Sequence, residues 1–202
     1  MDEAKSDVRF DEVYASSHEA ILGYLRRITG DVTLAEDLTQ ETFSRVARGL
    51  PRFRGNSKLT TWLYRIATNT FLDQRRRLKT RTAEIPELDL DMLDDVSSDL
   101  EDPAPKLPDR LLDDSEMGRC VREFVDGLHD EQRAVIVLHD LEGFKNREIA
   151  EILGCSLGTV KIRVHRARQE LRDVLGENCE FYRSDDDVLQ CGRKPWEVSS
   201  GS

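Results

Sequence analysis

The sequence predicts an all-α protein in which two small helical bundles are joined by an acidic flexible linker. Apolar residues recur at helical spacing along most of the chain, whereas the alternating β-branched pattern of strands is nearly absent. From Glu84 to Glu116, thirteen acidic residues face only Lys106 and Arg110, so this stretch carries −11 although the whole chain carries −10. Residues 82–110 also hold four of the six prolines. Such a composition marks a solvated tether. The predicted divisions are therefore 1–82, the linker 83–110, 111–176 and a tail 177–202.

The first bundle is predicted to contain three helices joined by short turns. Gly30 ends the first helix, and the run Thr33–Glu36 has the spacing of a capping box that opens the second. A Gly-Asn-Ser turn at residues 55–57 precedes the third. The expected helices span about 10–29, 33–49 and 59–81, which is enough for one compact bundle.

The second bundle is predicted to end in a helix-turn-helix, the most informative pattern in the chain. Its expected helices span about 111–127, 130–141, 146–153 and 157–175. Gly154 can take the left-handed conformation that ends a helix, and Ser156 can cap the next one. In the last helix, one stripe of apolar residues is expected to face inward: Val160, Val164, Ala167 and Leu171. The basic residues should then lie on the outer faces beside His165: Lys161, Arg163, Arg166, Arg168 and Arg172. A helix that is apolar on one side and basic on the other suits the major groove of DNA.

Two helices of the first bundle carry further candidate binding surfaces. In the second helix, four polar residues lie three and four apart and share one face, which favours a protein partner rich in arginine: Asp37, Gln40, Glu41 and Ser44. The third helix combines aromatic residues with an asparagine and arginines, a mixture that suits single-stranded DNA: Trp62, Tyr64, Phe71, Arg65, Asn69, Arg75, Arg76 and Arg77. For Trp62 and Phe71, packing in the core is the alternative interpretation.

Several other classes of protein are disfavoured. The chain contains no Walker loop, no Gly-x-Gly-x-x-Gly, no His-Glu-x-x-His and no nucleophile elbow, so no enzymatic activity is expected. No run of eighteen apolar residues exists, and the first residues lack the apolar core of a signal peptide. We therefore expect a cytoplasmic protein without membrane insertion. In that compartment the four unequally spaced cysteines do not indicate a structural disulfide framework.

Three separated motifs resemble the extracytoplasmic-function (ECF) class of bacterial sigma factors, in the sigma-70 family. Asp37-Leu-Thr-Gln-Glu-Thr-Phe43 is similar to region 2.2. Phe53-Arg-Gly-Asn-Ser57 and Thr61-Trp-Leu-Tyr-Arg-Ile-Ala-Thr-Asn69 are similar to regions 2.3 and 2.4, and residues 143–168 are similar to region 4.2. The resemblance covers about residues 10–175, in the order and spacing of the family.

The resemblance implies an alternative sigma factor that binds core RNA polymerase, reads the −35 and −10 promoter elements and opens the −10 DNA. It assigns the four polar residues of the second helix to the β′ clamp helices of the polymerase, with the β flap as a second polymerase contact. Trp62, Arg65, Asn69, Arg75 and Arg76 are assigned to single-stranded −10 DNA, where Asn69 would capture a flipped base. A larger set is assigned to the double-stranded −35 element: Ser156, Thr159, Lys161, Ile162, Arg163, His165 and Arg166. An anti-sigma factor is a further candidate partner, and the acidic linker is either an occupant of the RNA exit path or a solvated tether.

Two alternatives stay open from the sequence. An autonomous helix-turn-helix regulator would explain residues 143–168 but gives no role to the aromatic and basic third helix. A sensor of metal or redox state would use Cys179 and Cys191 of the tail, which lies beyond the family's shared plan. These two thiols could form a disulfide or supply half of a zinc site, with further ligands from Cys120, Cys155 or a histidine. No cofactor is required for the sigma-like function itself.

Overall fold

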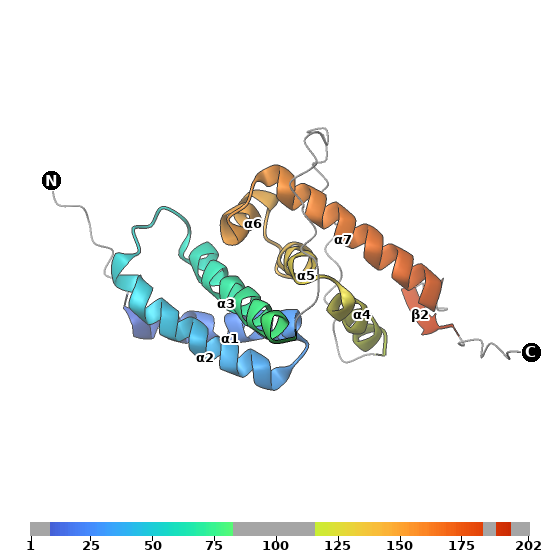
Figure 1. Ribbon diagram of the computed structural model, residues 1–202, viewed down its shortest axis with the longest axis horizontal. Helices are drawn as coiled ribbons and strands as arrows, with labels where there is room; N and C mark the ends of the chain where they lie inside the picture. The colour runs from blue at the N-terminus through green and yellow to red at the C-terminus, as the bar shows by residue number, and fades with distance from the viewer. Residues whose placement is uncertain (1–8, 83–115, 184–188, 195–202) are drawn as a thin grey trace, which may run out of the picture.

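A computed structural model describes residues 9–82, 116–183 and 189–194. Helices dominate this part of the chain (Figure 1), which confirms the predicted helical fold class. The first half contains α1 (Phe10–Thr29), α2 (Val32–Gly49), the short 3-10 helix η1 (Leu50–Arg52) and α3 (Leu59–Thr82). The second half contains α4 (Glu116–Gly127), α5 (Asp130–Ile136), the π-helical η3 (Val137–Leu141), α6 (Asn146–Leu153) and α7 (Leu157–Asn178). The predicted acidic linker at 83–110 lies outside the described residues.

The first helix ends where the sequence predicts. Gly30 has a φ of 68° and its N–H donates to the carbonyl of Arg26, the left-handed arrangement that terminates a helix. The apolar stripe of α1 is buried, with Ile21, Leu25 and Ile28 fully inside the core. Burying one such side chain stabilises the fold by about 1.5–3 kcal/mol. This stripe therefore fixes how α1 packs on α2 and α3.

The second helix begins one residue earlier than predicted, and with a different cap. The carboxylate of Asp31 accepts a hydrogen bond from the N–H of Leu34 at 3.0 Å, so Asp31 is the N-cap and Thr33 already lies inside α2. The capping box predicted at Thr33–Glu36 is wrong, because an aspartate two residues earlier competes for the same orphan N–H groups. Glu36 instead forms an exposed ion pair with Arg26 of α1.

A change of helix type separates α5 from the helix-turn-helix. The predicted helix at 130–141 is helical throughout, but its last five residues widen into the π-helical η3. There the N–H of Glu142 donates to the carbonyl of Val137 at 2.9 Å, five residues back. This widening lies between α5 and α6 and presents Glu142 to the first half of the molecule.

A small β-hairpin follows α7 directly, although the pattern of residues in the sequence predicts no strand. Strand β1 (Cys179–Arg183) pairs antiparallel with β2 (Leu189–Arg193), with Cys179 opposite Arg193 and Phe181 opposite Cys191. Each strand is only five residues long, so the alternating pattern is too short to stand out from helical spacing. The hairpin packs against α4, far from it in sequence.

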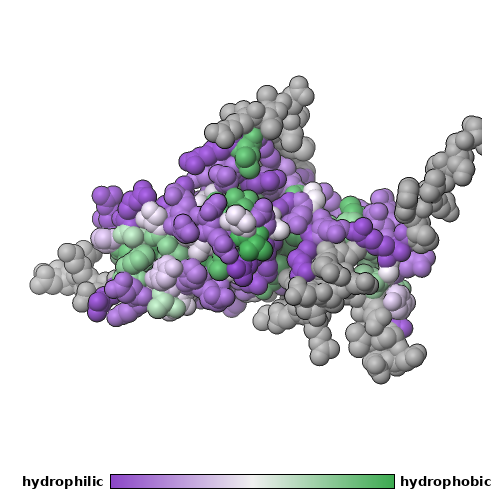
Figure 2. All heavy atoms as spheres, turned by 90° about the horizontal axis from the view of Figure 1, so that it is seen from below, coloured by the Kyte–Doolittle hydropathy of each residue, from purple (hydrophilic) through white to green (hydrophobic). Residues whose placement is uncertain are grey.

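One hydrophobic core runs through both halves. It joins α1, α2 and α3 to α5, η3, α6 and α7, and the rings of Tyr64 and Phe144 meet edge to face across the boundary at 4.7 Å. Seen from below, the described surface is mostly hydrophilic, with apolar side chains in separate patches (Figure 2). Helix α3 packs against α6 and α5 of the second half, so only part of its surface faces solvent (Figure 1).

Candidate polymerase and nucleic-acid surfaces

The predicted docking face of α2 is exposed to solvent. Asp37, Gln40, Glu41 and Ser44 are all exposed. A hydrogen bond from Arg45 at 2.8 Å lowers the pKa of Glu41, and the hydroxyl of Ser44 accepts a hydrogen bond from Arg48 at 2.7 Å. The face therefore carries negative charge at neutral pH beside arginine side chains of the same helix.

The candidate nucleic-acid face of α3 is narrower than the sequence implies. Trp62, Arg65, Asn69 and Arg76 lie on one side of the helix, because they are three, four and seven residues apart. Arg65, Asn69 and Arg76 are exposed, and the ring of Trp62 is half-buried, 5.0 Å from the ring of Phe53. The structure brings these four together as one polar, aromatic strip. Phe71 is 1% exposed and belongs to the core.

Arg75 does not lie on that strip. Its guanidinium donates to the carboxylate of Asp130 at 2.7 Å, and Lys79 contacts the same carboxylate at 2.8 Å. The side chain of Asp130 is only 7% exposed. Its burial raises the pKa, but the hydrogen bonds from Lys79 and Arg75 outweigh that effect, so the pKa lies below the ordinary value of 3.8. Arg75, which was predicted to contact the −10 element, is thus bound to a carboxylate of the second half.

The helix-turn-helix forms as predicted. Gly154 ends α6 with a φ of 66°, and the hydroxyl of Ser156 accepts a hydrogen bond from the N–H of Thr159 at 3.0 Å to cap α7. Val160, Val164 and Ala167 are buried and hold α7 against the rest of the second half. The start of α7 is therefore fixed in orientation, as a reading helix requires.

The candidate −35 residues fall into two groups. Ser156 and His165 are exposed, and the half-buried Thr159, Lys161, Ile162 and Arg166 lie beside them. Arg163 is only 15% exposed and pairs with Glu131 of α5. Arg168 is 23% exposed and donates to Asp140 at 2.6 Å. The expectation that all the basic residues of α7 lie on outer faces is wrong for Arg163 and Arg168, because carboxylates on neighbouring elements bind them: Glu131 of α5 and the buried Asp140 of η3.

Sequence reasoning did not find the partner of Arg168, a buried polar network in the π-helical segment. His139 and Asp140 are 8% and 5% exposed, and Nδ1 of His139 lies 2.7 Å from the carboxylate of Asp140. Burial raises the pKa of Asp140, but His139 and Arg168 together hold it below its ordinary value. The network ties α7 to η3. No local pattern marks it, since Arg168 is 28 residues from Asp140.

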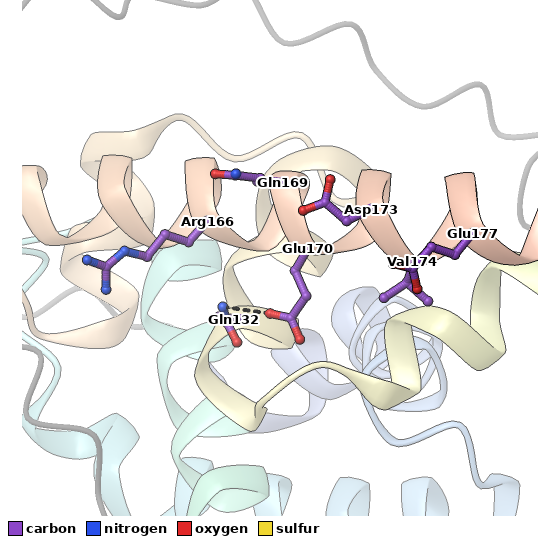
Figure 3. Close-up of a pocket in the computed structure, with 7 residues that line it drawn as sticks. All are labelled: Gln132, Arg166, Gln169, Glu170, Asp173, Val174 and Glu177. Atoms are coloured by element: carbon purple, nitrogen blue, oxygen red, sulfur yellow. Dashed lines mark hydrogen bonds between the residues drawn. The ribbon is translucent and has the colours of Figure 1, made fainter.

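The second half of α7 has the opposite charge. A shallow groove of about 300 Å³ lies between it and α5, and Figure 3 shows Arg166 at one end and Glu177 at the other. Glu170 accepts a hydrogen bond from Gln132 at 3.0 Å, and Asp173 lies on the next turn. These carboxylates would repel phosphate, so the candidate −35 surface of α7 does not extend beyond Arg166.

Several ion pairs hold the two halves together. Lys58, before α3, contacts Glu148 of α6 at 2.8 Å, and this hydrogen bond lowers the pKa of Glu148. Glu142, with a side chain 9% exposed, binds Arg27 of α1 at 2.6 Å and accepts a hydrogen bond from the hydroxyl of Tyr64 at 2.8 Å. Burial, followed by the charge of Glu142, raises the pKa of Tyr64 well above its ordinary value, so its hydroxyl stays protonated.

The contact between the two halves lies beside the polar, aromatic strip of α3. A cavity of about 440 Å³ is lined on one side by Trp62, Arg65 and neighbouring residues, and on the other by Gly154 and Cys155 of the helix-turn-helix. Cys155 is half-buried, and burial raises the pKa of its thiol. The α3 strip therefore lies beside the turn of the helix-turn-helix, immediately before Ser156, the first of the candidate −35 residues.

The tail thiols stand away from these surfaces. Cys179 is 2% exposed at the end of α7, and Cys191 is half-buried in β2. Among residues whose side chains the structure describes, no three of His, Cys, Asp and Glu are grouped to hold a metal; the side chain of Cys120 is outside that set. None of the described helices is long and apolar enough to cross a membrane.

Comparisons with known proteins agree with the motifs. Residues 13–81 match the family model of sigma-70 region 2, and residues 118–171 match that of sigma-70 region 4. The chain is 39% identical over 170 residues to the ECF RNA polymerase sigma factor SigE of Mycolicibacterium smegmatis, covering 84% of this chain but 62% of SigE. It is 34% identical over 174 residues to the RNA polymerase sigma factor YlaC of Bacillus subtilis, covering 86% of this chain and 95% of YlaC.

Solved structures give the same result. The sigma factor RpoE in complex with the anti-sigma factor NepR from Bartonella quintana matches with a TM-score of 0.58 at 26% identity, over 83% of this chain and 96% of that one. CnrH in complex with the cytosolic domain of CnrY matches with a TM-score of 0.58 at 25% identity, over 87% and 94% of the two chains. The chain therefore belongs to the ECF class of the sigma-70 family, the alternative sigma factors that direct promoter-specific transcription initiation.

Proposed function

We propose that this sigma factor divides its work among three surfaces. The α2 face with Asp37 and Glu41 docks on the β′ clamp helices of core RNA polymerase. The first half of α7, with Lys161 and Arg166, contacts the −35 element. The α3 strip captures an unstacked base of the −10 element through Asn69, whose amide offers both a donor and an acceptor.

The exposed strip on α3 is the observation that carries this assignment. Trp62 provides a flat ring, Arg65 a cation and Asn69 an amide on one side of a single helix, all accessible or half-accessible. An ordinary core helix would bury the aromatic ring, and an ordinary solvated helix would not place an aromatic between polar residues. This combination suits an unstacked base and its backbone, whereas an autonomous duplex-binding regulator has no use for it.

The arrangement of the two halves is the closed state of the factor in this proposal. By their names the −35 and −10 elements lie about 25 base pairs apart, which is roughly 85 Å of duplex at about 3.4 Å per base pair. Trp62 and Arg65 line the same cavity as Gly154 and Cys155, the turn that leads into the proposed −35 surface. The two surfaces are therefore too close together to occupy both elements at once. Polymerase binding must therefore separate the halves. An anti-sigma protein that favours the closed state would keep the factor inactive, and the similar sigma factor RpoE of Bartonella quintana is solved in complex with the anti-sigma factor NepR.

Transcription in vitro with core polymerase across a promoter library tests the function. Asn69→Ala should leave polymerase association unchanged and reduce permanganate reactivity of melted thymines. The reason is that the contact between Asn69 and a base forms only after that base has left the stack. Asn178→Ala, an exposed asparagine at the end of α7, is the matched control. Tight binding to free duplex promoter without polymerase, with no transcription in its presence, would instead support the autonomous regulator.

A further inference from the structure

The last residue of α2 is a glycine that lies against the ring of Trp62. Gly49 has a φ of −88° and a ψ of −29°, an ordinary right-handed backbone that any residue can adopt. Alanine is normally the better helix former at such a position. A Cβ atom on Gly49, however, would lie only 3.0 Å from Cζ2 of Trp62, closer than the about 3.5–4.0 Å of favourable carbon packing. The glycine therefore leaves room for the indole and is not required by the backbone.

A second residue contacts the same ring from the turn that follows α2. The 3-10 helix η1 contains Pro51, and the N–H of Phe53 donates to the carbonyl of Leu50 at 3.0 Å. This turn brings the ring of Phe53 to 5.0 Å from the ring of Trp62, with 41° between the two planes. Aromatic pairs at this separation attract each other beyond the area that they bury. Gly49 and Phe53 together therefore fix the indole against the end of α2.

Part of the indole surface stays open. Trp62 is half-buried and, with Arg65 of the same helix, lines one side of the cavity of about 440 Å³. The other side of that cavity is the turn of the helix-turn-helix at Gly154 and Cys155. The open part of the ring thus faces the second half of the chain here, and separation of the halves would leave it facing solvent.

We propose that Gly49 and Phe53 are positioning residues, which hold the Trp62 ring as a platform on which an unstacked base of single-stranded promoter DNA stacks. A ring that is already fixed loses little conformational freedom when the base binds. Every base has a π-face, so the platform supplies affinity for any base, whereas the amide of Asn69 supplies preference. The inference rests on the role proposed above for the α3 strip and adds two residues that act only through Trp62.

Binding of single-stranded DNA by the holoenzyme tests the proposal. The probe is an oligonucleotide with the −10 element of a transcribed promoter, each strand in turn, because a single strand needs no melting. Fluorescence anisotropy gives the dissociation constant. Trp62→Ala should weaken binding by about 5- to 150-fold, the effect of losing one base stacked on an aromatic ring. Gly49→Val and Phe53→Leu should each weaken it by at least about 5-fold, and Gly49→Ala by a smaller factor because its methyl group displaces the ring less.

Combined variants separate positioning from direct contact with DNA. In a chain that already carries Trp62→Ala, Gly49→Val and Phe53→Leu should cause no further loss, because the ring through which they act is missing. The free chain gives a second readout: with Trp196→Phe, Trp62 is the one remaining tryptophan, and Gly49→Val and Phe53→Leu should each shift its emission. Gly127→Ala is the matched control, since Gly127 also ends a helix and a Cβ there would meet no described atom within 4 Å.

The outcomes distinguish this inference from the function on which it rests. If Asn69→Ala weakens oligonucleotide binding but Gly49→Val and Phe53→Leu bind like the parent, the positioning is overturned and the α3 strip stands. A loss that persists beside Trp62→Ala also overturns it. If neither Asn69→Ala nor Trp62→Ala changes binding, both proposals fail. Circular dichroism and co-purification with core polymerase show whether each variant folds and docks, and Gly49→Ala and Phe53→Leu carry the test if Gly49→Val does not fold.

Discussion

Replacing Asp130 with asparagine should open the closed state and strengthen the apparent binding of core polymerase. Asp130 is the main carboxylate between α3 and α5, holding Arg75 and Lys79 at 2.7 and 2.8 Å. Removing one member of a fully buried ion pair costs about 3–5 kcal/mol. Arg75 and Lys79 are 37% and 35% exposed, however, so water recovers part of the loss. We therefore expect closure to weaken by about 1–2 kcal/mol, a factor of about 5–30 in the open-to-closed ratio.

This factor should appear directly in the polymerase affinity. If only the open state binds, the apparent dissociation constant is the intrinsic one divided by the open fraction, so a rarely open parent gains the full factor. The loss of a charge near the start of α5 affects both states alike and cancels. Fluorescence anisotropy with labelled core polymerase measures the affinity, and small-angle X-ray scattering measures the radius of gyration of the free chain.

A matched variant separates closure from a general effect of charge. Asp73 pairs with Arg45 and Arg76, both in the first half, at 3.0 and 3.1 Å. Asp73→Asn therefore removes a carboxylate from the same neighbourhood of α3 without breaking a contact between the halves. Equal scattering profiles and equal polymerase affinities for Asp130→Asn, Asp73→Asn and the parent would refute the reasoning, as would weaker polymerase binding by Asp130→Asn.

The other surfaces give shorter tests. Charge reversal of Asp37 and Glu41 should abolish co-purification with core polymerase while circular dichroism stays unchanged; retained co-purification in folded variants would show that α2 is not the docking face. Arg166→Ala should weaken closed-complex binding by about 1–3 kcal/mol if the contact reads a base, measured by footprinting on duplex promoter, and an unchanged footprint would remove Arg166 from the reading set. Because the pKa of Asp130 is lowered, its contribution to closure is complete above the ordinary value of 3.8 and is lost as the pH falls through the depressed value. Scattering should therefore be constant from about pH 6 to 8 and change only in acid, and expansion near neutrality would contradict this.

Local signals predicted most of the secondary structure, because each depends on neighbours in sequence. Gly30 and Gly154 end their helices and Ser156 caps α7 as expected. The cap of α2 was placed wrongly, since two polar residues competed for the same end and the local pattern does not rank them. The β-hairpin was missed because five-residue strands carry little periodicity, and this one is completed by packing on α4.

The candidate site was less predictable because its geometry depends on contacts distant in sequence. All residues of the candidate docking face lie on α2, so the spacing along a single helix was enough to predict that they share an exposed face. Whether Arg75, Arg163 and Arg168 are available to contact DNA depends on carboxylates 28 to 55 residues away. No spacing rule identifies those partners. An arginine in a basic helix can contact either DNA or a carboxylate of the same chain, and composition alone does not distinguish the two.

Because of the ion pairs between the two halves, separation of the halves and binding of DNA favour each other. In the proposed closed state, cations of the first half contact carboxylates of the second half at three places within the described part of the chain: Arg27 with Glu142, Lys58 with Glu148, and Arg75 and Lys79 with Asp130. Each carboxylate thus takes the position that a phosphate could take beside those cations. Separation would leave these four cations on the half that is proposed to contact single-stranded DNA and would remove three anions from it in the same step. Promoter phosphates would then compete with these carboxylates for the same cations, so the DNA backbone itself would favour the open state, and added salt would weaken both contacts through screening.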